Sequence, residues 1–128
     1  MQEIHEPKEL RRVVIIDDDP AFADLLTRMV GRLGHDAVVK ADPRASHTYE
    51  IRDDHIVFVD VLMPHVSGIQ VLEQLARQGV KAAIVLMSGD DHQLHEAEII
   101  IRKLDLRLLG VLYKPFLLHD VKEILEGA

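Results

Sequence analysis

Four apolar segments of the sequence each lead into a polar residue that could take part in chemistry. The most informative is Ile56–Val61, a largely β-branched segment that carries a carboxylate at Asp60 and is soon followed by Met63–Pro64. Such a segment is typical of a buried strand, and a buried carboxylate is energetically costly unless another group pairs with it. The other three segments and their polar residues are Val13–Ile16 with Asp17 and Asp18, Ala83–Met87 with Ser88, and Leu108–Tyr113 with Lys114.

Asp17, Asp18 and Asp60 would form a cluster of three carboxylates if their strands are neighbours in one sheet. Neighbouring strands lie about 4.8 Å apart, and carboxylates at that spacing raise one another's pKa unless a cation lies between them. The sequence has no cysteine, and no histidine stands at these strand ends. The expected cation is therefore Mg²⁺, which binds one or two carboxylates, waters and a phosphate oxygen.

A carboxylate nucleophile beside Mg²⁺, a hydroxyl group and an ammonium group is suited to phosphoryl transfer. Asp60 is the predicted nucleophile, and an aspartyl-phosphate is the predicted product. Lys114 and Mg²⁺ would neutralise charge on the phosphoryl oxygens, and the Ser88 hydroxyl would donate a hydrogen bond to them.

The pattern of apolar residues predicts the elements that must bring these side chains together. Strands are expected at residues 13–16, 37–40, 56–61, 83–87 and 108–113, and helices at 20–33, 42–51, 68–78, 91–104 and 117–125. In the first helix, Asp19 is the predicted N-cap. The residues predicted to face the core from that helix are Phe22, Leu25, Leu26, Met29, Val30 and Leu33. Alternating strands and helices indicate an α/β fold with a parallel sheet, and such sheets bind ligands beyond the carboxyl ends of their strands.

Composition limits the class of protein. At 128 residues, with 48% hydrophobic and 29% charged residues, the chain is expected to form one globular domain over residues 1–128. The net charge of −7 argues against a nucleic acid or an acidic membrane as partner, since both need clustered basic residues. Neither a secretion signal nor an apolar segment of the roughly 20 residues needed to span a bilayer is visible. The expected location is the cytoplasm.

Together these motifs resemble the receiver domain of bacterial two-component response regulators, and in particular the chemotaxis receiver. The resemblance covers essentially the whole chain and rests on four motifs in order. They are Ile15–Pro20, the block from Asp60 through Met63–Pro64 to Ser67–Gly68, Met87–Gly89, and Tyr113–Phe116. It implies a flavodoxin-like (βα)5 three-layer sandwich with a parallel sheet of strand order 2-1-3-4-5. It also implies a cis peptide bond between Lys114 and Pro115.

The resemblance implies a role for each residue of the predicted site. Asp60 would accept a phosphoryl group from a sensor histidine kinase or a phosphotransfer protein. Asp18 and Asp60 would bind Mg²⁺ directly, Asp17 would bind it through water, and the backbone carbonyl of Leu62 would be a further ligand. The phosphoryl group would be held by Ser88 and Lys114.

The readout of phosphorylation is expected to differ from that of many receivers. These often carry an aromatic residue three positions before the lysine, where this chain has Val111. Val111 is short and stiff at χ1, which leaves Tyr113 as the aromatic residue on the same face of the strand. The expected partner is an output domain, another protein or a second copy of the chain. A weaker likeness, over Leu104–Phe116, is to receivers fused to EAL domains, which are cyclic-di-GMP phosphodiesterases.

Two other functions remain open from the sequence. A Mg²⁺-dependent phosphatase working through an aspartyl-phosphate would need a general acid close behind the nucleophile, where the chain has Leu62, and 128 residues leave little room for a substrate cap. A degenerate receiver that acts only as a binding module would not need the intact set of acidic residues. The preferred interpretation is therefore a receiver that acts as a switch controlled by phosphorylation. The domain is not expected to be an enzyme with an external substrate.

Overall fold

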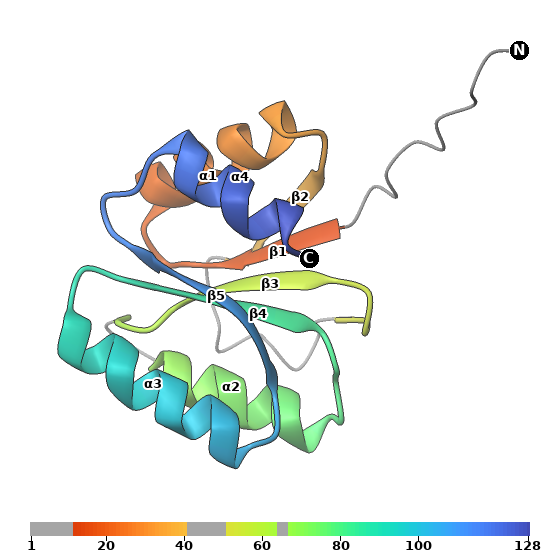
Figure 1. The fold of residues 1–128 in the computed structure, drawn as a ribbon, viewed down its shortest axis with the longest axis vertical. Coiled ribbons are helices and arrows are strands. Elements are labelled where there is room, and N and C mark those ends of the chain that lie inside the picture. The colour runs from red at the N-terminus through yellow and green to blue at the C-terminus, as the bar shows by residue number, and fades with distance from the viewer. Residues whose placement is uncertain (1–11, 41–50, 64–66) are drawn as a thin grey trace, which may run out of the picture.

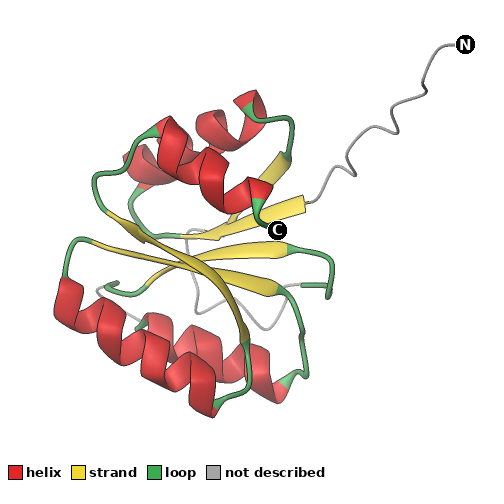
Figure 2. Cartoon of the chain, in the orientation of Figure 1, coloured by secondary structure: helices red, strands yellow, loops and turns green. Residues whose placement is uncertain are grey.

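In the described part of the chain, strands and helices mostly alternate and stack in three layers, with one sheet between two pairs of helices (Figure 1, Figure 2). The structure is a computed structural model, and it describes residues 12–40, 51–63 and 67–128. Its elements are β1 (Arg12–Ile16), α1 (Pro20–Arg32), β2 (Asp36–Lys40), β3 (Ile56–Asp60), α2 (Gly68–Arg77), β4 (Ala83–Ser88), α3 (Asp91–Lys103), β5 (Arg107–Tyr113) and α4 (Leu118–Glu126).

The five strands are parallel and lie in the order β2-β1-β3-β4-β5. This confirms the flavodoxin-like fold and the strand order that the resemblance implied. Observed and predicted strand ends differ by a single residue, for example at β3, which ends at Asp60 where Val61 was expected. The helix predicted at 42–51 falls almost wholly within residues 41–50, which lie outside the described part of the chain.

Side chains alternate between the two faces of the sheet, so each strand contributes to two cores. One core lies between the sheet and α2 and α3, and the other lies between the sheet and α1 and α4 (Figure 1). From β1 and β3 the first core receives Val14, Ile16, Val57 and Val59, and the second receives Val13, Ile15, Ile56 and Phe58. Burial on both faces explains why these strands contain almost no polar residues.

Helix α1 begins where the sequence predicted, because the Asp19 side chain accepts hydrogen bonds from the backbone N–H groups of Ala21 and Phe22. The prediction that Leu25 faces the core is wrong, since this residue is 46% exposed. The buried residues of this helix are Ala23, Leu26 and Val30. Each helical residue advances by about 100°, which places Leu25 more than a quarter-turn from the centre of that buried stripe.

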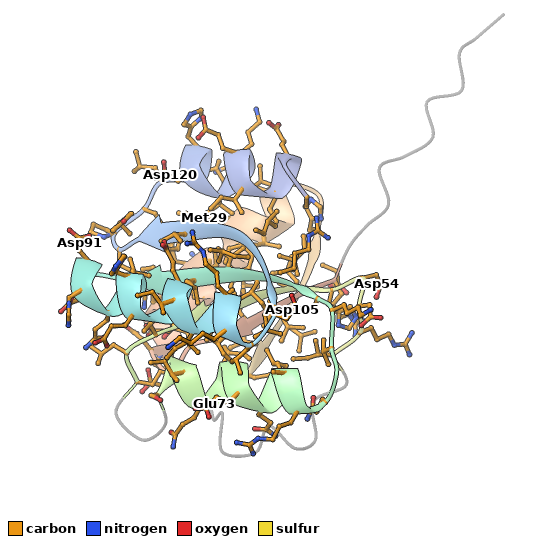
Figure 3. All side chains as sticks on the ribbon, turned by 60° about the horizontal axis from the view of Figure 1, so that its bottom comes forward. Met29, Asp54, Glu73, Asp91, Asp105 and Asp120 are labelled. Carbon is orange, nitrogen blue, oxygen red and sulfur yellow. The ribbon has the colours of Figure 1, made fainter. Side chains whose placement is uncertain are left out.

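The connection from β5 to α4 contains the cis peptide bond predicted between Lys114 and Pro115. Figure 3 shows charged side chains projecting outward from the helices and loops, among them Glu73 on α2, Asp91 at the start of α3 and Asp105 just after its end. In the described part of the chain, no helix is both long enough and apolar enough to cross a membrane.

Candidate functional site

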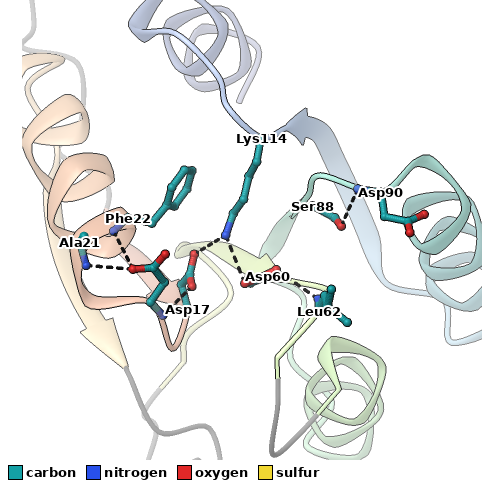
Figure 4. Close-up of polar contacts among 9 residues, drawn as sticks. Asp17, Ala21, Phe22, Asp60, Leu62, Ser88, Asp90 and Lys114 are labelled. Atoms are coloured by element: carbon teal, nitrogen blue, oxygen red, sulfur yellow. Dashed lines mark hydrogen bonds and ion pairs between the residues drawn. The ribbon is translucent and has the colours of Figure 1, made fainter.

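The parallel arrangement brings the carboxyl ends of β1, β3, β4 and β5 to one edge of the sheet (Figure 4). Asp17 follows β1 directly, Asp60 ends β3, Ser88 ends β4, and Lys114 follows β5. The first three are almost completely buried, with exposed fractions of 0%, 5% and 1%. Buried polar side chains are stable only when other polar groups compensate them, so their contacts show how the site is held together.

Lys114 links the two buried carboxylates. Its Nζ atom lies 2.9 Å from Oδ2 of Asp17 and 3.2 Å from Oδ2 of Asp60 (Figure 4). The lysine side chain is itself only 21% exposed. In such surroundings charge-assisted hydrogen bonds are stronger than at an open surface, so Lys114 holds the ends of β1 and β3 together.

Backbone N–H groups hold the other oxygen of each carboxylate. Oδ1 of Asp17 accepts a hydrogen bond from the backbone N–H of Asp19 at 3.0 Å, and Oδ1 of Asp60 accepts one from the N–H of Leu62 at 3.1 Å. Each carboxylate is therefore held by the loop that follows its own strand, with one oxygen toward that loop and the other toward Lys114.

The start of α2 lies directly against the end of β3. A Cβ atom at Gly68 would lie 2.6 Å from the carbonyl oxygen of Asp60 and 2.7 Å from Cα of Val61. The Gly68 N–H donates to the Val61 carbonyl at 3.0 Å, and the Ser67 side chain caps the helix through Gln70. The glycine is required by this close approach, which holds the start of α2 against the end of β3.

Burial and charge act in opposite directions on the two central groups. Desolvation by burial, followed by the negative charge of Asp17, raises the pKa of Asp60 from 3.8 to about 6, although Lys114 and the Leu62 N–H favour the ionised form. Desolvation alone would lower the pKa of Lys114, but its hydrogen bonds and charge interactions with Asp17 and Asp60 outweigh that effect, and the net result is a raised pKa. The lysine is therefore charged at neutral pH and is not a general base.

Asp17, Asp18 and Asp60 offer one carboxylate oxygen each within 4.8 Å of one another, and Asp18 is only half-buried. One ammonium group against three carboxylates leaves two negative charges uncompensated when all are ionised, which is the charge of one divalent cation. The donors are all oxygens, and part of the cluster faces solvent. The residues present therefore fit Mg²⁺, which keeps several of its waters and binds carboxylates.

Ser88 joins the site to α3. Its hydroxyl oxygen accepts a hydrogen bond from the backbone N–H of Asp90 at 3.1 Å, and its backbone carbonyl accepts one from the N–H of Lys114 at 2.9 Å. The Asp90 side chain then caps α3 by accepting from the N–H groups of His92 and Gln93. The Ser88 hydroxyl proton has no acceptor among these contacts, so it remains available to a ligand in the site.

Val111 and Tyr113, the two residues expected to take part in the readout, occupy different environments on β5. Val111 is half-buried and packs against the core on the α2 and α3 side, whereas Tyr113 is 55% exposed. Neither makes a hydrogen bond or ion pair with the acidic cluster in the described structure. They lie near the site along β5 but are not part of it.

Three residues of the site region were not predicted as functional from the sequence. Asp90 contacts Ser88, Gly68 permits the close approach to β3, and Phe22 lies beneath the ammonium group of Lys114. Gly68 belongs to one of the four motifs on which the resemblance to receiver domains rests. Phe22 was expected only as a core residue, since helical spacing predicts which face is buried and not which side chain covers it.

A flavodoxin-like sheet of this strand order is the architecture of response regulators among the solved structures. A response regulator from Colwellia psychrerythraea superimposes with a TM-score of 0.83 at 30% identity, covering 92% of this chain and 95% of that one. The response regulator TrrA from Thermotoga maritima, solved in complex with Mg²⁺-BeF, superimposes with a TM-score of 0.73 at 20% identity over 91% of this chain and 97% of that one.

The chain belongs to the family of response regulator receiver domains, whose family model matches residues 13–126. Among curated relatives, the regulator RpaA from Synechocystis is 31% identical over 116 residues, which cover 89% of this chain and 46% of RpaA. The chain spans less than half the length of the curated relatives it matches, for example 18% of ARR21 from Arabidopsis thaliana. The domain is thus a receiver of two-component signal transduction, as the sequence motifs predicted.

Proposed function

We propose that this receiver accepts a phosphoryl group on Asp60 from the phosphohistidine of a sensor kinase or of a phosphotransfer protein. The observation that supports this most directly is the position of Lys114, whose ammonium group lies 2.9 Å from Asp17 and 3.2 Å from Asp60 at the carboxyl ends of the strands. A permanent positive charge beside a nucleophilic carboxylate is suited to hold the oxygens of a transferred phosphoryl group.

In the proposed step, a carboxylate oxygen of Asp60 attacks phosphorus, and the bond between phosphorus and the donor imidazole nitrogen breaks. Lys114 stays within reach of the phosphoryl oxygens as they approach, and the Ser88 hydroxyl donates a hydrogen bond to another of them. The Leu62 N–H keeps the Asp60 side chain oriented through Oδ1. These groups are positioned before the donor arrives, which reduces the reorganisation that the transfer requires.

Mg²⁺ would be held by Asp18 and Asp60 directly, by Asp17 through water and by the Leu62 carbonyl, and it would supply charge neutralisation during transfer. Oxygen ligands within 4.8 Å of one another and two uncompensated negative charges support this assignment. The TrrA complex with Mg²⁺-BeF, which has the same fold, is consistent with it. A phosphatase acting on external substrates is less well supported, because Leu62, which is 60% exposed, offers no acid behind Asp60.

Intact-mass measurement after incubation with a small phosphodonor such as acetyl phosphate tests the proposal. We expect a gain of one phosphoryl group in the wild type with Mg²⁺, and no gain with EDTA or in Asp60→Asn. An equal gain in Asp60→Asn would show that another residue is the acceptor. Labelling that EDTA leaves unchanged would remove Mg²⁺ from the proposal.

We further propose that the state of Asp60 is read out through the Ser88–Asp90 loop and α3. The Ser88 hydroxyl accepts from the Asp90 N–H, so a hydroxyl group drawn toward a phosphoryl oxygen would move the residue that caps α3. Val111 would not change rotamer, and the exposed Tyr113 would report the shift on β5. The surface of α3, β5 and α4 would then bind an output domain, another protein or a second copy of the chain.

Chemical-shift mapping with and without beryllium fluoride, a mimic of the phosphoryl group, tests this route. We expect shifts that extend from the metal-binding loops through residues 88–104 to Tyr113. Shifts confined to the loops after β1 and β3 would contradict the proposed readout and leave the phosphoacceptor assignment intact.

A further inference from the structure

Phe22 lies directly against the charged end of Lys114. The Nζ atom of Lys114 is 4.0 Å from the centroid of the Phe22 ring (Figure 4). An ammonium group at this distance from an aromatic face is attracted by the negative charge of the π system. The two hydrogen bonds to Asp17 and Asp60 and the ring together surround the ammonium group.

The ring is itself held in place from two directions. Phe116 packs its ring against Phe22 in an edge-to-face arrangement, with centroids 5.1 Å apart and planes at 88°. Phe116 is 6% exposed and follows Lys114 by two residues, so one connection supplies both the ammonium group and the support for the ring. On the other side, the Phe22 N–H donates to Oδ1 of Asp19 at the start of α1.

These contacts form a closed series of interactions that starts and ends at Asp17. Oδ1 of Asp17 accepts from the Asp19 N–H, Asp19 accepts from the Phe22 N–H, and the Phe22 ring lies under Lys114. Lys114 then donates back to Oδ2 of Asp17. Phe22 therefore contacts the lysine through its ring and, through its backbone and Asp19, the loop that carries the acidic pair.

We propose that Phe22 is a positioning residue for Lys114, which directs the ammonium group toward Asp17, Asp60 and an incoming phosphoryl group. A π face attracts the cation but accepts no strong hydrogen bond, so the N–H groups of the lysine are left to the carboxylates. Water in place of the ring would compete for those N–H groups and would let the flexible side chain leave the site. This inference rests on the proposed phosphoryl transfer to Asp60 and names a residue that tunes it.

The variants Phe22→Leu and Phe22→Tyr distinguish the effect of the aromatic face from the effect of apolar packing at this position. Leucine keeps an apolar side chain and removes the π face, whereas tyrosine keeps the face. Met29→Leu is the matched control, because Met29 also packs partly buried on α1 but is not among the contacts of the site (Figure 3). Circular dichroism spectra and thermal unfolding establish that all three variants are folded before any comparison.

The first measurement needs no phosphorylation. The carbon next to Nζ of Lys114 is bonded to an atom that lies 4.0 Å from the ring centroid, so we expect the NMR signals of its protons upfield in the wild type, in Phe22→Tyr and in Met29→Leu. In Phe22→Leu they are expected at the position of exposed lysines. Signals of Lys114 that are unchanged in Phe22→Leu would overturn the proposal.

The second measurement is the rate of labelling by acetyl phosphate with Mg²⁺. We expect a loss of about fivefold to tenfold in Phe22→Leu, in the range that one cation–π contact supports, and rates near wild type in the other two variants. Equal rates in Phe22→Leu and the wild type would overturn the positioning role in catalysis. If the wild type is not labelled at all, the proposed function fails, and the NMR comparison alone decides whether Phe22 holds Lys114.

Discussion

Asp60→Asn is expected to stabilise the metal-free protein, although it removes the proposed phosphoacceptor. In the wild type the Asp60 carboxyl is buried beside Asp17, and both effects favour its neutral form. Asparagine has nearly the same shape and carries no charge, but its single carbonyl oxygen can replace only one of the two carboxylate oxygens, which accept from the Leu62 N–H and from Lys114 respectively. The substitution therefore removes the repulsion and the cost of burying a charge, and it keeps one of the two hydrogen bonds of the side chain.

The size of the effect follows from the pKa. Folding raises the pKa of Asp60 from 3.8 to about 6. At about 1.4 kcal/mol per pKa unit, ionised Asp60 costs the folded state about 3 kcal/mol at neutral pH, an upper limit for the gain in Asp60→Asn. The folded state binds the proton of Asp60 more tightly than the unfolded state does. The free energy of unfolding of the wild type therefore falls as the pH rises from 3.8 to about 6, and this loss is constant above that pH.

Urea unfolding in EDTA, followed by circular dichroism, measures the difference. At neutral pH Asp60→Asn should unfold at higher urea than the wild type, and the difference should shrink towards zero as the pH falls to about 4. Asp105→Asn makes the same change of charge at an exposed site after α3 and should show no such pH dependence (Figure 3). Mg²⁺ should stabilise the wild type and have much less effect on Asp60→Asn. A variant less stable than the wild type at neutral pH in EDTA would refute the reasoning.

Three further predictions concern other parts of the site and the opposite end of β3. Gly68→Ala should destabilise the protein by about 1–3 kcal/mol in urea unfolding, because its Cβ atom would meet the end of β3 at 2.6 Å; Gly31→Ala, with nothing within 4 Å, should not. Ser88→Ala should slow labelling by acetyl phosphate by about tenfold or more, whereas Ser88→Thr should retain the hydroxyl group and most of the rate. Desolvation by burial lowers the pKa of His55, whose Nδ1 atom accepts from a backbone N–H. Its contribution to stability is therefore lost as the pH falls below its ordinary value of 6.5, and His55→Asn should approach the wild type in unfolding free energy there.

Much of the fold could be predicted because strands buried on both faces leave a strong signal. The segments around Val14, Val57 and Ile84 contain almost no polar residue until their carboxyl ends, and alternation with helices implies a parallel sheet. The strand order came from the resemblance and not from the pattern of apolar residues. The buried faces of the helices were predicted less well. Leu25 fits the same apolar spacing as its neighbours, yet the position of the sheet leaves it exposed.

The polar members of the site could be predicted for a related reason. A carboxylate or a lysine at the end of a buried strand must be compensated, and parallel strands bring such ends together, so residue type and position were sufficient for Asp17, Asp60 and Lys114. Contacts that depend on how elements cross could not be predicted in this way. Phe22 reaches Lys114 because α1 packs beside the connection from β5 to α4, and Gly68 meets β3 because α2 starts against it. The sequence does not show which charged group an apolar residue of a helix will contact. For Phe22 the one available hint is its position within the first turn after the acidic run, where a side chain on the inner face of the helix has to lie near the ends of the strands.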